Sequence, residues 1–152
     1  MAKSASLNKV VILFAMEQEA APTIARLGLK PVGAFAPPLA CLAFEGEHEG
    51  LAVAVVVNGT DAVFKTANVG TVAAALTAHA VCERLKPDLL ISAGTAGGFK
   101  ARGGCIGDVY VTSDSVNHDR RWRDARRRAR ARVGEAVAQD ELAGGGYACV
   151  RA

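Results

Sequence analysis

Four short runs of β-type apolar residues constrain the fold of this chain more than any other feature. They cover residues 9–15, 39–44, 51–57 and 88–93, and each is far too short to cross a membrane. Segments of helical character over residues 17–27 and 70–85 alternate with these runs. Strands that alternate with helices are typical of an α/β architecture, and a hairpin among them makes the sheet mixed.

The ends of these segments carry their own signals. Lys9 to Ala15 is so rich in Val, Ile, Leu and Phe that it predicts a fully buried strand. Pro22 lies close to the first turn of the first helix, where a missing N–H costs least, and Gly28 suits its end. The acidic segment 45–50 predicts a hairpin turn between the second and third runs. The remaining predictions are loops over 58–68 and 100–104 and a strand over 106–116.

The charge of the chain changes sign near residue 120. Residues 1–119 carry nine Lys/Arg against eleven Asp/Glu, whereas residues 120–152 carry nine Arg against four Asp/Glu. Arginine falls on every face of a helix drawn through the second part, so no apolar stripe remains to be buried. We therefore expect a folded domain over 1–119 and an Arg/Ala/Gly-rich tail over 120–152 that is disordered or irregular.

The basic tail also holds Trp122, the only tryptophan. Arginines with an interleaved aromatic residue can bind single-stranded nucleic acid. One aromatic residue in so irregular a run favours a solvated tail instead, and we expect no nucleic-acid partner.

The four cysteines, Cys41, Cys82, Cys105 and Cys149, form no C-x-x-C pair, and no His stands at zinc-ligand spacing. The apolar run near the N-terminus is too short for a signal peptide. We therefore expect reduced, buried thiols in a cytoplasmic protein that has neither a metal nor a membrane contact. The glycine motifs of dinucleotide and P-loop nucleotide sites are absent, so no cofactor is expected.

Candidate chemistry lies where two of the predicted strands end. Met16, Glu17 and Glu19 follow the first strand, and the glycine-rich segment 94–98 directly follows the strand over 88–93. If these strands are parallel neighbours, a carboxylate and a glycine-rich turn share one crevice, where the carboxylate can act as a general base on water. From spacing alone the alternative stays open: the acids only stabilise a helix start, and the glycines only form a tight turn.

Four motifs, in order, resemble methylthioadenosine nucleosidases of the nucleoside phosphorylase superfamily, and the plant type most. They are AMEQEA (15–20), NVGTVAAAL (68–76), KPDLLISAGTAGGF (86–99) and IGDVYVTSDSVNHDRR (106–121). The resemblance covers residues 9–121. It implies a three-layer α/β sandwich with a mixed central sheet, truncated here after its first half, and a homodimer. It also implies hydrolysis of the N-glycosidic bond of 5′-methylthioadenosine in methionine salvage, and in some relatives of S-adenosylhomocysteine.

The resemblance assigns roles to particular residues. Glu19 matches the glutamate that activates water, and Met16 matches the methionine that lines the ribose pocket. The segment beside the water and the purine is matched by Thr95, Ala96 and Gly97. Val69 matches a position that approaches the ribose or the alkylthio group. The phosphate loop of the phosphorylases is replaced by A-M-E-Q-E, which favours hydrolysis over phosphorolysis.

The second half of the nucleosidase pattern is missing from these 152 residues. It supplies the aspartate that protonates the purine, the glutamate that grips the ribose hydroxyls and the aromatic residue that stacks on the purine. Ser113 and Asp114 match a different family position. We therefore expect a nucleosidase-like hydrolase with little or no turnover by itself. The alternative is a non-catalytic truncated isoform that dimerises with the full-length enzyme or modulates it.

Overall fold

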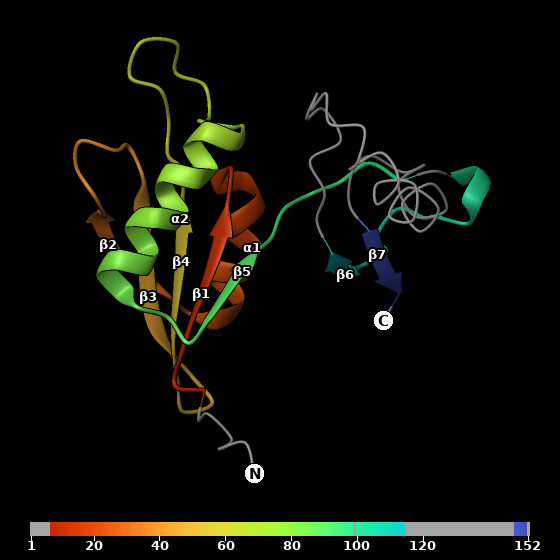
Figure 1. The fold of residues 1–152 in the computed structure, drawn as a ribbon, viewed down its shortest axis with the longest axis horizontal. Coiled ribbons are helices and arrows are strands. Elements are labelled where there is room, and N and C mark those ends of the chain that lie inside the picture. Colours follow the sequence, from red (N-terminus) through yellow and green to blue (C-terminus); the bar gives the residue numbers. More distant parts are fainter. Residues whose placement is uncertain (1–6, 99, 115–147, 152) are drawn as a thin grey trace, which may run out of the picture. The chain divides into compact units, whose positions relative to one another are not determined.

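The structure, a computed structural model, describes residues 7–98, 100–114 and 148–151 (Figure 1). The chain divides into two compact units after Thr95. The first unit contains the strands β1 (Lys9–Phe14), β2 (Lys30–Ala34), β3 (Leu42–His48), β4 (Leu51–Val57) and β5 (Leu89–Ser92) and the helices α1 (Glu17–Leu27) and α2 (Thr71–Leu85).

The five strands form one mixed sheet in the order β2-β3-β4-β1-β5. β1 pairs in parallel with β4 on one side and with β5 on the other. β3 is antiparallel to both β2 and β4. The predicted α/β architecture with a mixed sheet and a β3–β4 hairpin is confirmed, and the carboxyl ends of β4, β1 and β5 meet at one edge.

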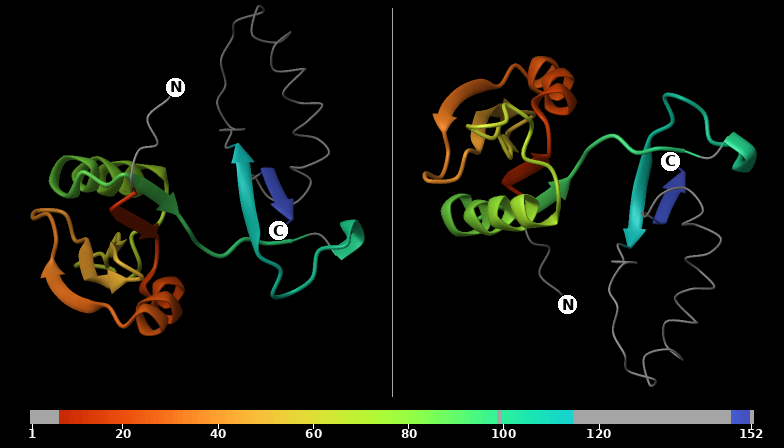
Figure 2. Two further views of the ribbon diagram at one scale, coloured as in Figure 1. Left: turned by 90° about the horizontal axis from the view of Figure 1, so that it is seen from below. Right: turned by 90° about the horizontal axis from the view of Figure 1, so that it is seen from above.

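The two helices cover opposite faces of this sheet (Figure 2). On one face, Val81 of α2 packs in a cluster with Val11 and Val56. On the other face, Ala20 of α1 packs in a cluster with Phe14 and Val55. Strand residues alternate between the two faces, which is why the central strands read as continuous apolar runs.

The predicted limits of the helices agree closely with the structure. α1 ends at Leu27 and is followed by Gly28, whose φ of 63° is left-handed and costs glycine little. Pro22 lies inside α1, beyond its first turn. α2 starts at Thr71, one residue later than predicted, because Gly70 has a φ of 109° and precedes the helix.

Three strand predictions need correction. β2 was not predicted, since Pro31 and Gly33 weaken its β character, and it forms an exposed edge strand. The acidic segment 45–50 is strand as far as His48, and the turn itself consists of Glu49 and Gly50, which both have positive φ. The run predicted over 39–44 enters the sheet only at Leu42.

The second unit contains the 3-10 helix η1 (Lys100–Arg102) and the antiparallel strands β6 (Tyr110–Asp114) and β7 (Ala148–Arg151). The strand predicted over 106–116 begins at Tyr110, because residues 106 and 107 form a turn. The predicted boundary between residues 119 and 120 lies outside the described residues, as do Trp122 and most of the predicted tail.

The expected burial of the thiols is right for one residue and wrong for two. Cys41, Cys82 and Cys105 are unpaired, and Cys41 is buried. Cys82 is exposed on α2, and Cys105 is exposed in the turn before β6. None of the helices in the described ranges has both the length and the apolar character needed to span a membrane.

Candidate active site

The candidate site is built where β1 and β5 end. These strands are parallel neighbours with Leu13 opposite Ser92, and the Ala93 N–H donates to the Leu13 carbonyl oxygen over 2.8 Å. The predicted crevice required the first strand and the strand over 88–93 to be parallel neighbours, and they are. α1 starts directly after β1, so its first turn stands beside the segment that leaves β5.

Glu19 is the acidic residue that reaches this segment. Its Oε1 accepts hydrogen bonds from the Thr95 N–H over 2.8 Å and from the Thr95 hydroxyl over 2.7 Å. Its Oε2 accepts the Met16 N–H over 3.3 Å, which closes the start of α1. Three donors therefore fix both carboxylate oxygens, whereas Glu17 is exposed.

Gly94 permits this close approach. A Cβ atom at Gly94 would lie 3.3 Å from Oε1 of Glu19, tighter than an ordinary contact. The glycine thus allows the backbone after β5 to pass beside the carboxylate.

The hydrogen bonds also set the charge of Glu19. Partial burial acts to raise the pKa of its carboxyl group, but hydrogen bonds from the Thr95 N–H, the Thr95 hydroxyl and the Met16 N–H lower it by more. The net pKa lies below its ordinary value of 4.5. The group is therefore ionised at neutral pH and able to accept a proton.

The other residues singled out from the sequence are distributed differently. Met16 is half-buried and adjoins Glu19. Ala96 and Gly97 follow Thr95 in the chain, are exposed, and belong to the second unit. Val69 lines a separate pocket and is 61% exposed.

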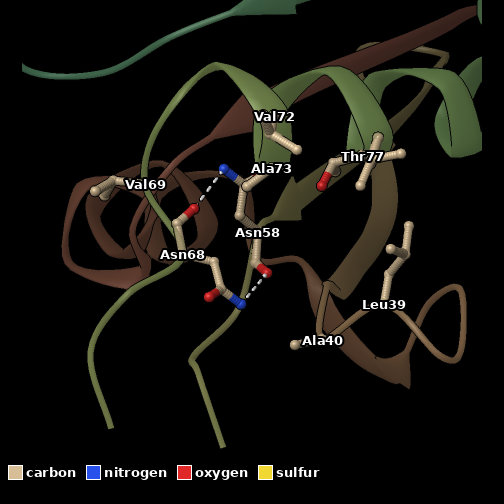
Figure 3. A pocket seen from close by; sticks show the side chains of 9 residues that line it. Leu39, Ala40, Asn58, Asn68, Val69, Val72, Ala73 and Thr77 are labelled. Carbon is tan, nitrogen blue, oxygen red and sulfur yellow. Dashed lines mark hydrogen bonds between the residues drawn. The ribbon is translucent and has the colours of Figure 1, made fainter. Parts of the chain in front are cut away.

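This pocket lies on the α2 side of the sheet, where β4 ends (Figure 3). Its volume is about 340 Å³, which is within the range of small-ligand sites. It is lined by Leu39, Ala40, Asn58, Asn68, Val69, Val72, Ala73, Leu76 and Thr77. Asn58 and Asn68 were not singled out from the sequence. Two signals were available: both residues bound the predicted loop over 58–68, and Asn68 opens the NVGTVAAAL motif.

Within the described ranges, no group of three His, Cys, Asp or Glu side chains is arranged to hold a metal ion. The chemistry that this edge of the sheet offers is that of an oriented carboxylate with a hydroxyl group beside it.

The sequence pattern of the phosphorylase superfamily matches residues 9–142. The chain therefore belongs to this superfamily. The match extends beyond residue 121, where the resemblance was expected to end.

Two plant proteins are close relatives of the chain. It is 42% identical over 120 residues to the 5′-methylthioadenosine nucleosidase of Arabidopsis thaliana, a match that covers 76% of this chain and 44% of the relative. It is 43% identical over 117 residues to a 5′-methylthioadenosine/S-adenosylhomocysteine nucleosidase of the same plant, covering 76% and 46%.

The fold is similar as well. The solved structure of the apo Arabidopsis thaliana 5′-methylthioadenosine nucleosidase superimposes with a TM-score of 0.74 at 40% identity, covering 80% of this chain and 50% of that one. The chain thus spans about half the length of these relatives.

Proposed function

We propose that this chain carries the water-activating part of a nucleosidase site for 5′-methylthioadenosine. One observation carries the proposal: the ionised Glu19 carboxylate is held by Thr95 and Met16 beyond the carboxyl ends of two parallel strands. Ligands of open α/β sheets bind at this edge. The similarity to the two plant nucleosidases supports the same assignment.

In the proposed reaction, Glu19 accepts a proton from a water molecule below the anomeric carbon of the ribose. The water oxygen bonds to this carbon as the bond to the purine nitrogen breaks. The bonding electrons leave with the purine, which takes a proton from the acid that, in the family resemblance, stands in the second half of the pattern. The products are adenine and methylthioribose. The Thr95 hydrogen bonds keep the base oriented and ionised before the reaction.

The other matched residues are proposed to bind the nucleoside. Met16 lines the ribose. The purine and the water lie beside Thr95, Ala96 and Gly97. Val69 approaches the ribose or the alkylthio group. We propose that the reaction needs no metal ion or cofactor. We also propose a cytoplasmic location.

We further propose that the 152-residue chain is weak or inactive by itself. In the family resemblance, the acid that protonates the purine and the glutamate that binds the ribose hydroxyls stand in the second half of the pattern. Glu19 then has no acid opposite it, so departure of the purine is slow.

Two measurements on the purified chain test these proposals. Calorimetric titration should show binding of methylthioadenosine and adenine, and the same titration with S-adenosylhomocysteine gives the preference between the nucleosides. An adenine-release assay should show little or no turnover. A chain that binds none of these ligands contradicts the nucleosidase proposal. Rapid adenine release that Glu19→Ala abolishes contradicts the proposed inactivity.

A second candidate function is supported by exposed apolar side chains. Val72 and Leu76 are 72% and 48% exposed on α2, and Val69 stands just before it. We propose that this surface pairs with a second copy of the chain, or with a full-length nucleosidase subunit that the chain then modulates. Co-expression with a tagged full-length nucleosidase, followed by size-exclusion chromatography, tests the mixed pair; separate elution contradicts it.

A further inference from the structure

The loop between β4 and α2 is closed at its base by two asparagines (Figure 3). Nδ2 of Asn58 donates to the Asn68 carbonyl oxygen over 2.9 Å, and Nδ2 of Asn68 donates to the Asn58 carbonyl oxygen over 3.4 Å. The Asn68 N–H also donates to the Gly59 carbonyl oxygen over 2.9 Å. We call this arrangement the Asn58–Asn68 clamp. Asn58 is only 6% exposed, so its hydrogen bonds are shielded from competing water.

The clamp is attached to the sheet on two sides. The Asn58 N–H donates to the Phe14 carbonyl oxygen over 3.3 Å, which joins the ends of β4 and β1. A Cβ atom at Gly59 would collide with the carbonyl oxygen of Ala40, so the backbones touch there. The base of the loop is therefore held against the strand whose end precedes Met16 and Glu19.

The tip of the same loop is organised separately. Oδ1 of Asp61 accepts the Val63 N–H over 2.8 Å and the Phe64 N–H over 2.7 Å. Val63 and Phe64 are each 78% exposed. Because the tip and the base use different hydrogen bonds, one can be disturbed without the other.

Val69 directly follows Asn68, so the clamp constrains the backbone at Val69. Its N–H is held by the Ala67 carbonyl oxygen over 2.9 Å. Asn58, Asn68 and Val69 line the pocket together with apolar residues of α2. Val69 is 61% exposed and so has little packing of its own to fix it. Its position therefore depends on the backbone that the clamp holds.

We propose that Asn58 and Asn68 are positioning residues that fix Val69 for the 5′-alkylthio side of the nucleoside. This inference rests on the proposed nucleosidase function. If Val69 is already held in place before the nucleoside binds, no entropy is lost in ordering it around the ligand. Loss of the clamp should therefore weaken binding of the alkylthio nucleoside and leave binding of the free purine base unchanged.

The test compares three variants of the 152-residue chain with the wild type. Asn58→Asp keeps the shape of the side chain and removes the donor of the shorter clamp bond. Asn68→Ala removes the longer bond, and Asp61→Ala is the control that loosens only the tip. Each protein is titrated calorimetrically with methylthioadenosine and with adenine, and amide hydrogen exchange is followed at residues 67–70.

We expect Asn58→Asp to weaken methylthioadenosine binding about tenfold and to leave adenine binding within about twofold, as for the loss of one ordering hydrogen bond. Exchange at residues 67–70 should accelerate. Asn68→Ala should also weaken methylthioadenosine binding and accelerate exchange at residues 67–70, but less than Asn58→Asp. If Asn58→Asp does not fold, Asn68→Ala becomes the variant that tests the inference. Asp61→Ala should leave both affinities unchanged.

The outcomes separate this inference from the function on which it rests. A wild-type chain that binds neither ligand overturns the proposed function and this inference with it. Normal methylthioadenosine binding by variants with accelerated exchange overturns the inference alone. An equal loss of affinity for methylthioadenosine and for adenine also overturns the inference, because the clamp would then only support the fold.

Discussion

Glu19 is one of two acidic residues in the first turn of α1, and its position in that turn decides its contacts. The third helical position allows its carboxylate to reach back to the Met16 N–H while it also faces Thr95. Glu17 points to solvent instead. Glu19, to which the A-M-x-x-E pattern assigns water activation, is the residue of the pair that contacts Thr95. Its catalytic role stays a proposal.

Replacement of Glu19 by glutamine tests this role in a chimera. Residues 1–121 are joined to the second half of the Arabidopsis thaliana 5′-methylthioadenosine nucleosidase, which supplies the residues that the resemblance places there. We expect the chimera to release adenine and Glu19→Gln to lower the rate about 10²–10⁴-fold, the usual contribution of a general base. Glutamine keeps an oxygen acceptor for Thr95 but has neither the charge nor the second acceptor for the Met16 N–H, so the melting temperature should fall modestly while the variant stays folded. Full activity of the variant would contradict the assignment.

The lowered pKa of Glu19 predicts a pH-dependent contribution to stability. A carboxyl group whose pKa is lower in the folded than in the unfolded state stabilises the fold above its unfolded pKa, and the contribution disappears as the pH falls through the folded pKa. The melting temperature of Thr95→Val should therefore lie below that of the wild type at neutral pH, and the gap should narrow in acid.

An NMR titration of the Glu19 carboxyl group provides the direct measurement. Thr95→Val removes the hydroxyl donor and should raise the pKa of Glu19 toward 4.5. An unchanged pKa would show that the hydroxyl hydrogen bond does not stabilise the ionised form.

At the scale of single elements, the sequence succeeded where the local pattern is strong. The helix over 17–27 is bounded by Glu17 and by a glycine that adopts left-handed backbone geometry, and both signals are local. β2 was missed because pairing with β3, and not its own composition, holds it in the sheet. The β3–β4 turn was placed too broadly because acidic residues on an exposed strand look the same in sequence as acidic residues in a turn.

The close approach of Gly59 to Ala40 makes a prediction about stability. Gly59→Ala should destabilise the chain by roughly 2–4 kcal/mol, because its Cβ meets a backbone oxygen and its φ is 76°. Gly50→Ala is the matched control, with a φ of 80° but no atom within 4 Å of the added Cβ, and should cost about 1 kcal/mol. Urea unfolding measures both. Equal losses would show that the contact with Ala40 gives way.

At the scale of the whole molecule, the described surface retains apolar side chains that a monomer normally covers. Val72 and Leu76 lie one helical turn apart on the exposed side of α2 that lines the pocket, and Phe64 is exposed in the preceding loop. Because the side chains of Val72 and Leu76 are exposed, either residue can be replaced by a charged one without damage to the core. This surface is the basis of the proposed pairing.

Val72→Asp tests the pairing surface. The wild type should have the mass of a dimer in size-exclusion chromatography with light scattering, and Val72→Asp that of a monomer. An acidic residue near the start of α2 is favourable for the helix, so the variant should stay folded. Ala74→Asp, which adds the same charge on another side of α2, should remain dimeric. A monomeric wild type, or a dimeric Val72→Asp, would contradict the pairing.

The sequence by itself determined the α/β class with a mixed sheet and the order of its main strands and helices along the chain. These features follow from local patterns: apolar runs of strand length, helix ends marked by glycine, and motifs in a fixed order. Only the tertiary structure decided which donors hold the carboxylate, how β2 joins the sheet and how Asn58 and Asn68 close their loop. Those contacts depend on the packing of segments far apart in the chain, for which no local pattern exists.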